Sequence, residues 1–238
     1  MQNRARNCGR IYNHAYDILT NPRILVCLKR KGWRNIGNKH MKISCPSPEE
    51  VERYFEQWEK DSAFGYKKTD ESLNGLFTQA YSLNADVYGV LAKIFALNSA
   101  YGTQIPSPCF ILLAERIVRI GGLDNGLKDG DLNVVNEISK VIEYKNGRGE
   151  NRRHTPYSFT TKYASFHNPE KYPIYDSNVQ RALIYFRDNC SLPTFTNAEL
   201  RVYTSFVKVI ESMRVSFKLG RISLRKLDKY LYRVGKEV

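Results

Sequence analysis

A lysine and an aspartate that lie close in the sequence are the residues best suited to covalent chemistry. Residues 155–183 read TPYSFTTKYASFHNPEKYPIYDSNVQRAL, in which Asp176 follows Lys162 by 14 positions. A neutral lysine amine can attack an electron-poor carbon, and a carboxylate stabilises positive charge that develops beside it. A solvated surface lysine and an ordinary helix cap would give the same spacing, so both interpretations stay open at this point.

Two predicted helices must position this pair. A start signal at residues 155–156 predicts a helix to about residue 167, with Lys162 on its polar face. Asp176 follows an extended stretch and predicts the N-cap of a helix to about residue 188, whose backbone N–H groups would hold the carboxylate. Lys162 can then face a groove beside that cap. The opposite face of the first helix is expected in the core and carries Phe159, Tyr163 and Phe166.

Helix signals recur along most of the chain. Apolar periodicity and caps predict further helices over 47–60, 84–101, 107–120, 131–142, 196–219 and from 223 onward. Only residues 23–28 resemble a strand. We therefore predict an all-α fold of nine or ten helices in a single domain, residues 1–238, or in two lobes with a cleft near residues 145–160.

The charge distribution favours a polyanionic partner. The chain has a net charge of +13 and a pI near 9.5. Residues 1–42 carry 10 Lys or Arg against one Asp, a net +9, and residues 201–238 carry 10 against three acids, a net +7. The ends are either solvated basic helices or a surface that faces phosphates, where binding would release counterions and depend on salt.

Cysteine usage and hydropathy indicate a cytoplasmic protein without a metal or cofactor. No run of 18 apolar residues occurs, and the first residues lack the apolar core of a secretory signal. The cysteines are widely spaced and form no Cys-x-x-Cys pair, so we expect small buried hydrophobic residues and no zinc site or iron–sulfur cluster. They are Cys8, Cys27, Cys45, Cys109 and Cys190.

Two islands of sequence carry a family resemblance. In the first, Lys162 precedes an extended stretch and Asp176, and residues 158–164, SFTTKYA, stand where a Gly-apolar-Gly-x-Lys-x-Ala hairpin would stand. In the second, residues 98–103, NSAYGT, resemble a Ser-Ala-Gln-Ala-Thr run that ends a buried helix. In this order the islands resemble the helix-hairpin-helix DNA glycosylase superfamily, which includes endonuclease III and 8-oxoguanine DNA glycosylase, in a branch without an iron–sulfur cluster.

The resemblance implies base excision from duplex DNA that contains a damaged base or an abasic site. It implies an all-helical domain with a divergent helix-hairpin-helix, in which Lys162 attacks C1′ to form a Schiff base and Asp176 stabilises the charge on the sugar. Strand cleavage by β-elimination would follow. The lysine needs a lowered pKa for this reaction, through desolvation or neighbouring cations.

The resemblance also implies DNA contacts outside the reacting pair. Tyr101 would fill the hole left by the everted base, and a core aromatic at the end of its helix is the simpler interpretation. Arg152, Arg153 and Lys171 would supply cations near Lys162 and contact phosphates. Ser158 and Thr160 replace the two glycines of the hairpin, so their phosphate contacts would differ from the usual backbone ones.

Two other classes of function remain open on the sequence. The chain could be a non-catalytic nucleic-acid binder on the same scaffold, or a helical protein-interaction module whose basic ends meet an acidic protein. Salt-sensitive DNA affinity distinguishes the first from the second. In a bacterium, DNA binding would place the protein at the nucleoid. The lesion, the pathway and the oligomeric state are not encoded in any local pattern.

Overall fold

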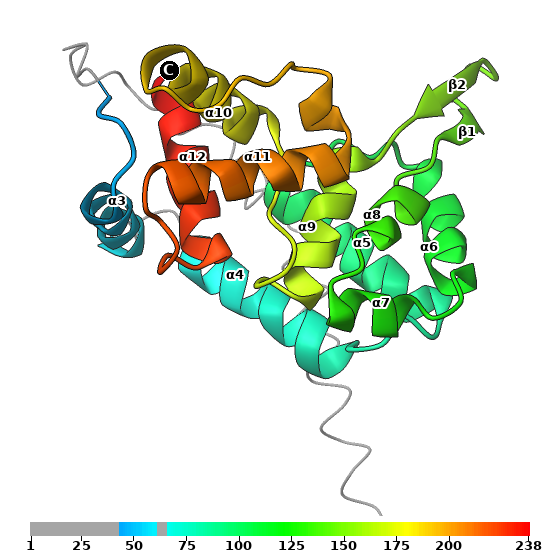
Figure 1. The fold of residues 1–238 in the computed structure, drawn as a ribbon. Coiled ribbons are helices and arrows are strands. Elements are labelled where there is room, and N and C mark those ends of the chain that lie inside the picture. The colour runs from blue at the N-terminus through cyan, green and yellow to red at the C-terminus, as the bar shows by residue number, and fades with distance from the viewer. Residues whose placement is uncertain (1–42, 61–65) are drawn as a thin grey trace, which may run out of the picture. The chain divides into compact units, whose positions relative to one another are not determined.

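The computed structural model describes residues 43–60 and 66–238, and the predicted all-α class is confirmed (Figure 1). The described residues form ten α-helices and one two-stranded sheet. The helices are α3 (Pro48–Lys60), α4 (Tyr66–Gly75), α5 (Val87–Tyr101), α6 (Cys109–Arg119), α7 (Leu123–Asp129), α8 (Asn133–Ile138), α9 (Tyr157–His167), α10 (Ser177–Asn189), α11 (Tyr203–Ser216) and α12 (Leu224–Glu237). A π-helical turn, Leu76–Ala80, follows α4, and a 3-10 turn, Glu199–Arg201, precedes α11.

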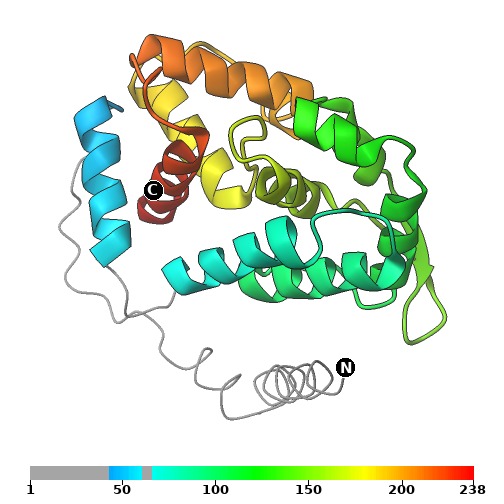
Figure 2. The ribbon, with the colours of Figure 1, turned by 90° about the horizontal axis from the view of Figure 1, so that it is seen from below.

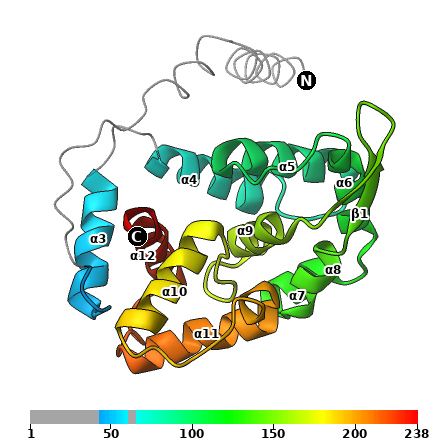
Figure 3. The same cartoon turned by 90° about the horizontal axis from the view of Figure 1, so that it is seen from above.

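Helix α9 lies at the centre of the fold, between α5, α7, α8 and α10 (Figure 3). Its residues 159–166 are all buried. The predicted core aromatics Phe159, Tyr163 and Phe166 are among them, and Phe77 contacts two of these rings edge-on or tilted. The polar face of α9 is buried as well, so its lysine must find partners inside the protein.

Helix α12 packs closely against α10 and α3. An added Cβ at Gly235 of α12 would lie 1.9 Å from the backbone oxygen of Asn178 in α10, so only glycine fits this crossing. On the other side, the Tyr54 hydroxyl of α3 donates to Glu237 at 2.7 Å, and the Tyr54 ring meets Tyr230 edge-on. These contacts fix the face of α12 that points toward α9.

A β-hairpin stands where the sequence predicted the end of one helix and a flexible connection. Strand β1 (Ile142–Lys145) pairs antiparallel with β2 (Asn151–His154), and the hairpin projects beside α6 (Figure 2). The predicted helix over 131–142 is therefore wrong beyond Ile138, where α8 ends. The β-branched residues after it favour a strand, and Gly149 takes the positive φ of 77° that closes the turn. The strand predicted at residues 23–28 lies outside the described residues.

The predicted helix-hairpin-helix is not present at residues 158–164. These residues belong to the continuous helix α9, and the connection that precedes it is the β-hairpin. The predicted long helix over 196–219 is also divided. Thr196 and Glu199 do form the expected capping box, but they cap the 3-10 turn, and extended backbone at Val202 (φ −104°, ψ 112°) separates that turn from α11.

The cysteines depart from the expectation of unpaired thiols. Cys45 and Cys190 form a disulfide with a Cα–Cα distance of 5.4 Å, across 145 residues of sequence. Cys109 is buried and free, as predicted. Cys8 and Cys27 lie outside the described residues. A local spacing rule could not find a pair that only the tertiary fold brings together.

Residues 43–238 pack as one unit around a continuous apolar core. The predicted single domain of residues 1–238 stays a prediction, because residues 1–42 with their net charge of +9 lie outside the described part of the chain. The two-lobe alternative with a cleft near residues 145–160 also stays untested; that range holds the hairpin and the first turn of α9. No described helix is both long and apolar enough to span a bilayer.

Candidate active site

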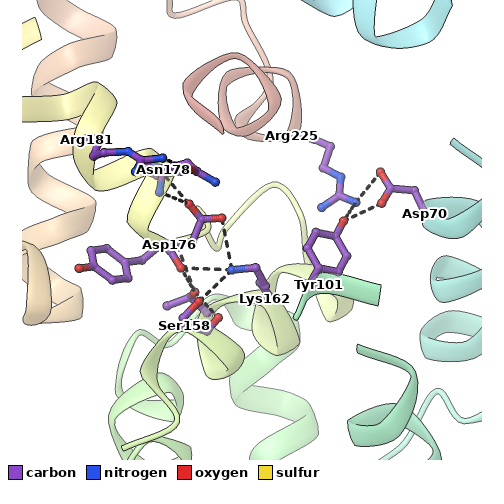
Figure 4. Close-up of polar contacts among 11 residues, drawn as sticks. Asp70, Tyr101, Ser158, Lys162, Asp176, Asn178, Arg181 and Arg225 are labelled. Atoms are coloured by element: carbon purple, nitrogen blue, oxygen red, sulfur yellow. Dashed lines mark hydrogen bonds and ion pairs between the residues drawn. The ribbon is translucent and has the colours of Figure 1, made fainter. Parts of the chain in front are cut away.

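Lys162 is buried at the middle of α9, and its amine faces polar partners from two elements (Figure 4). The Nζ atom donates to Ser158 Oγ at 2.9 Å and to the Tyr175 carbonyl at 3.4 Å. It lies 3.5 Å from Asp176 Oδ2, and the side chains of this ion pair are 3% and 15% exposed. The structure therefore brings together the two residues that the sequence singled out, within ion-pair distance.

The extended segment before α10 is held against α9, and this places Asp176. Thr161 Oγ1 donates to the Tyr175 carbonyl at 3.3 Å and accepts from the Tyr175 backbone N–H at 3.1 Å. Asp176 then caps α10 as predicted, with Oδ1 accepting from the N–H groups of Asn178 and Val179, both at 2.9 Å. The cap uses one carboxylate oxygen and leaves Oδ2 for the lysine.

Burial lowers the pKa of Lys162, and the carboxyl groups of Asp176 and Asp228 oppose that shift. A lower pKa raises the fraction of neutral amine, which is the nucleophilic form of lysine. The predicted alternative cause, neighbouring cations at Arg152 and Arg153, is wrong. Both lie exposed on β2, where they pair with Glu150 at 2.5 Å and Glu143 at 3.4 Å.

The pair opens into a cavity of about 180 Å³. This volume is below the roughly 300–1,000 Å³ of pockets for drug-sized ligands, so the cavity suits a compact group such as one planar ring system. Its lining combines acids, cations and aromatic rings from α3, α4, α5, α9, α10 and α12. The residues with these side chains are Trp58, Asp70, Tyr101, Lys162, Asp176, Asp228, Lys229 and Tyr232.

Tyr101 lies in the wall of this cavity and does not have the orientation of a wedge. Its hydroxyl donates to Asp70 Oδ1 at 2.6 Å, and Arg225 Nη2 donates to the hydroxyl at 3.4 Å (Figure 4). The ring packs edge-on against Phe166. The predicted wedge is therefore corrected in this conformation, because the side chain points inward and its hydroxyl is tied to a buried ion pair.

A second charged cluster lies opposite Lys162. Asp70 of α4 pairs with Arg225 at 3.0 Å and with Lys229 at 3.1 Å, both from α12. The Lys229 amine also sits 3.0 Å from the centroid of the Trp58 ring. Because two cations share one carboxylate and Lys229 also lies on an aromatic face, this side of the cavity is held together by charge as well as by packing.

Asp228 of α12 is the third carboxyl group of the cavity and is half-buried. Burial raises its pKa to about 7, with Asp176 and Asp70 adding to the shift and Arg225 and Lys162 opposing it. No hydrogen bond or ion pair joins its side chain to another of the described residues. It can therefore hold a proton near neutral pH. The other two carboxyl groups of the cavity form ion pairs with cations.

The predicted DNA-contact residues have different placements. Thr160 is fully buried and donates to the Pro156 carbonyl at 2.8 Å, so the predicted phosphate contact is wrong for this residue. Ser158 is a partner of Lys162 and faces the site instead. Lys171 is exposed in the loop after α9, as are Arg152 and Arg153 on the hairpin, so all three stay available to a partner.

Sequence reasoning missed the part of the site on α3, α4 and α12. Asp70 lies 92 positions before Lys162, whereas Asp228 and Lys229 lie 52 and 53 positions after Asp176, and no local motif links them to the pair. The one usable signal was on α12, where charged residues recur at i, i+3 and i+4 from Arg225 beside an apolar stripe. No cluster of three metal-ligating side chains exists among the residues in the described ranges.

Comparison with known proteins places this site within a family. Residues 50–171 match the HI_0787_N family, described as an N-terminal domain, and this range includes Lys162 but ends before Asp176. A protein of Haemophilus influenzae (strain ATCC 51907 / DSM 11121 / KW20 / Rd), described as an uncharacterized protein, is 36% identical over 149 residues, which are 63% of this chain and 67% of the relative. No solved structure matches the chain. The match covers half of the chain, so the chain belongs to the HI_0787_N family.

Proposed function

We propose that the protein is a DNA glycosylase with Schiff-base lyase activity on damaged or abasic DNA. The observation that carries this proposal is the 3.5 Å contact between Lys162 Nζ and Asp176 Oδ2 at the wall of a small cavity. A structural ion pair needs no cavity, whereas a nucleophile does. The order of Lys162 and Asp176 and the likeness of residues 98–103 to the helix-hairpin-helix glycosylases agree with it, although the hairpin itself is not present at residues 158–164.

The chemistry follows from the position of each group. An everted nucleotide would bring its C1′ atom to Lys162, whose neutral amine attacks as the bond to the base breaks. Asp176 stabilises the positive charge on the sugar and accepts the proton that the amine loses. Opening of the sugar ring then gives the Schiff base, as the proton held by Asp176 passes to the ring oxygen. Asp176 next takes a proton from C2′, and loss of the 3′ phosphate by β-elimination cleaves the strand.

The DNA surface would draw on cations that are not already paired inside the protein. In residues 201–238, the side chains of Arg214, Arg225, Lys226 and Lys229 form ion pairs with carboxylates. Exposed candidates include Lys171 and, on the hairpin, Arg152 and Arg153, whose ion pairs with carboxylates lie on the surface. Since each neutralised phosphate contributes about −0.9 to the log–log salt slope on duplex DNA, these side chains set a slope of only a few units.

Borohydride trapping on an oligonucleotide with an abasic site tests the proposal directly. The wild-type protein is expected to form a covalent adduct, and Lys162→Gln is expected to form none. Lys208→Gln is the matched control, because Lys208 is an exposed lysine of α11 that lines no part of the cavity. Absence of an adduct with the wild type, or an equal adduct with Lys162→Gln, would refute the mechanism.

The same samples test the alternative of a non-catalytic nucleic-acid binder. The observation that favours it is the absence of the hairpin and of its two glycines, because residues 158–164 belong to the continuous helix α9. Salt-dependent binding to duplex DNA without trapping, unchanged by Asp176→Asn, would support this alternative. Little DNA binding at moderate salt would instead point to a protein-interaction module.

A further inference from the structure

One carboxyl group of the cavity has no direct cation partner among the described residues. Asp176 pairs with Lys162, and Asp70 pairs with both Arg225 and Lys229. All three cations are thereby used by two carboxylates. The third carboxyl group, on Asp228, lines the same cavity and has no hydrogen-bond or ion-pair partner in the described part of the chain.

Asp228 is held in this position by a rigid element. It lies one turn after Arg225 on α12, between the buried core residues Leu227 and Tyr230. The close backbone approach of α12 to α10 at Gly235 anchors this helix against its neighbour. The carboxyl group is therefore preorganised beside the reacting pair, as an acid or base that acts on a substrate must be.

The charges around Asp228 come from every element that packs on this side of the cavity. They are the carboxyl groups of Asp70 on α4 and Asp176 at the start of α10, and the cations of Lys162 on α9 and of Arg225 and Lys229 on α12 itself. Burial together with the two neighbouring carboxylates favours the neutral, protonated form of Asp228. A carboxyl group that keeps its proton near neutral pH can donate it.

We infer that Asp228 is the general acid of base excision, the group that donates a proton to the base as it leaves the sugar. The inference rests on the proposed glycosylase function and adds a residue to it. The C1′–N bond breaks and its electron pair stays on the base, which takes the proton of the Asp228 carboxyl group. The lone pair of Lys162 forms the new bond to C1′, and the amine proton passes to Asp176, so protons and charge balance.

This role separates two activities that share Lys162. Excision of a base needs an acid, because a base leaves poorly as an anion. Cleavage at a preformed abasic site has no base to expel and needs only Lys162 and Asp176. The substrate class is accordingly a base whose departure requires protonation, and Asp228 is dispensable for the lyase step.

The test compares excision with abasic-site cleavage in single-turnover assays on otherwise identical duplexes. The duplexes carry 8-oxoguanine, hypoxanthine, uracil, thymine glycol or an abasic site. We expect Asp228→Asn to lower excision of the preferred base by about 100-fold or more, which is the range of general acid catalysis. Abasic-site cleavage should stay within about threefold of wild type, a bound that tests whether the shared Lys162 chemistry is intact.

Two further variants control for folding and for charge. Asp228→Glu keeps an acid on the same helix face and should recover part of the excision rate. Asp188→Asn removes an exposed carboxylate of α10 that pairs with Arg187, and it should leave both activities unchanged. Wild-type excision should fall as the pH rises through about 7, and this fall should be absent in Asp228→Asn.

Three results would overturn the inference. The first is an Asp228→Asn variant that excises bases at the wild-type rate and with the wild-type pH dependence. The second is an Asp228→Asn variant that loses excision and abasic-site cleavage to the same extent. The third is a wild-type protein that cleaves abasic sites but excises none of the four bases. Failure of the Lys162-dependent trapping reaction is a separate outcome, since it refutes the proposed function itself.

Discussion

Replacing Asp176 by asparagine separates the two tasks of this carboxylate. An asparagine side-chain oxygen can still accept the N–H groups of Asn178 and Val179, so the cap of α10 is kept. The charge opposite Lys162 is lost. The effect on stability therefore reports the ion pair and excludes the cap.

The magnitude follows from the choices open to Lys162. Removing one partner of a buried ion pair costs about 3–5 kcal/mol when the other charge stays. A lysine can instead lose its proton, at about 1.4 kcal/mol for each unit between the pH and its ordinary pKa of 10.5. Because burial already lowers the pKa of Lys162, we expect Asp176→Asn to lower the free energy of unfolding by about 2–4 kcal/mol at pH 7.

The pH dependence gives this prediction its sign. In Asp176→Asn the folded protein binds fewer protons than the unfolded chain between the lowered pKa of Lys162 and its ordinary pKa. Its stability must then rise with pH in that window, and the difference from wild type must shrink. Urea unfolding at pH 7 and pH 9 measures both quantities, and Asp176→Ala should cost about 1 kcal/mol more through the lost cap.

One result would refute the reasoning. If Asp176→Asn changes the unfolding free energy by less than about 0.5 kcal/mol at pH 7, the amine is not held by this carboxylate in solution. A difference from wild type that does not change with pH would mean that the loss comes from packing. In either case the chemistry proposed for the pair would lose its physical basis.

Three further predictions concern the frame of the site. Gly235→Ala should lower the free energy of unfolding, measured in urea, by about 1–3 kcal/mol, because its Cβ would lie 1.9 Å from a backbone oxygen of α10. Gly121→Ala, whose Cβ would have nothing within 4 Å, should change it little. Equal effects of the two variants would contradict the close contact between α12 and α10. Cys190→Ser should cost about 2–4 kcal/mol under non-reducing conditions, since the disulfide links residues 145 apart, and dithiothreitol should bring wild type to the same value; five titratable thiols in the unreduced, denatured protein, one for each cysteine of the chain, would refute the pairing. Burial lowers the pKa of Lys93 to about 8, so the free energy of unfolding of the wild type should rise relative to that of Lys93→Met between pH 8 and 10.5. Urea unfolding that shows no such rise would mean that the amine is solvated.

The helices were predictable where local signals agree with burial. The starts of α3, α10 and α12 follow from cap residues that do accept the expected N–H groups, at Ser47, Asp176 and Ser223. The interior of α9 was predictable in part, because its aromatic periodicity is that of a core helix. The burial of its polar face was not, since the partners that make it tolerable come from other elements.

The hairpin and the far side of the cavity were hidden for a different reason. Val141 and Ile142 fit a helical stripe as well as a strand, and only the pairing with residues 151–154 decides between them. Asp70 and Asp228 come from helices that meet only after the chain has folded. A local pattern can nominate a reactive pair, but the groups that tune its protonation are set by tertiary packing.

The two lysines that are buried in the described part of the chain show why the partners matter more than burial. Lys93 donates to two neutral acceptors, the Leu83 carbonyl at 3.1 Å and Asn84 Oδ1 at 2.6 Å. Lys162 is equally buried but meets a carboxylate at the edge of a cavity. The first arrangement satisfies a charge for the sake of the fold. The second places the amine beside a carboxylate at a cavity, which is the arrangement that the proposed chemistry requires.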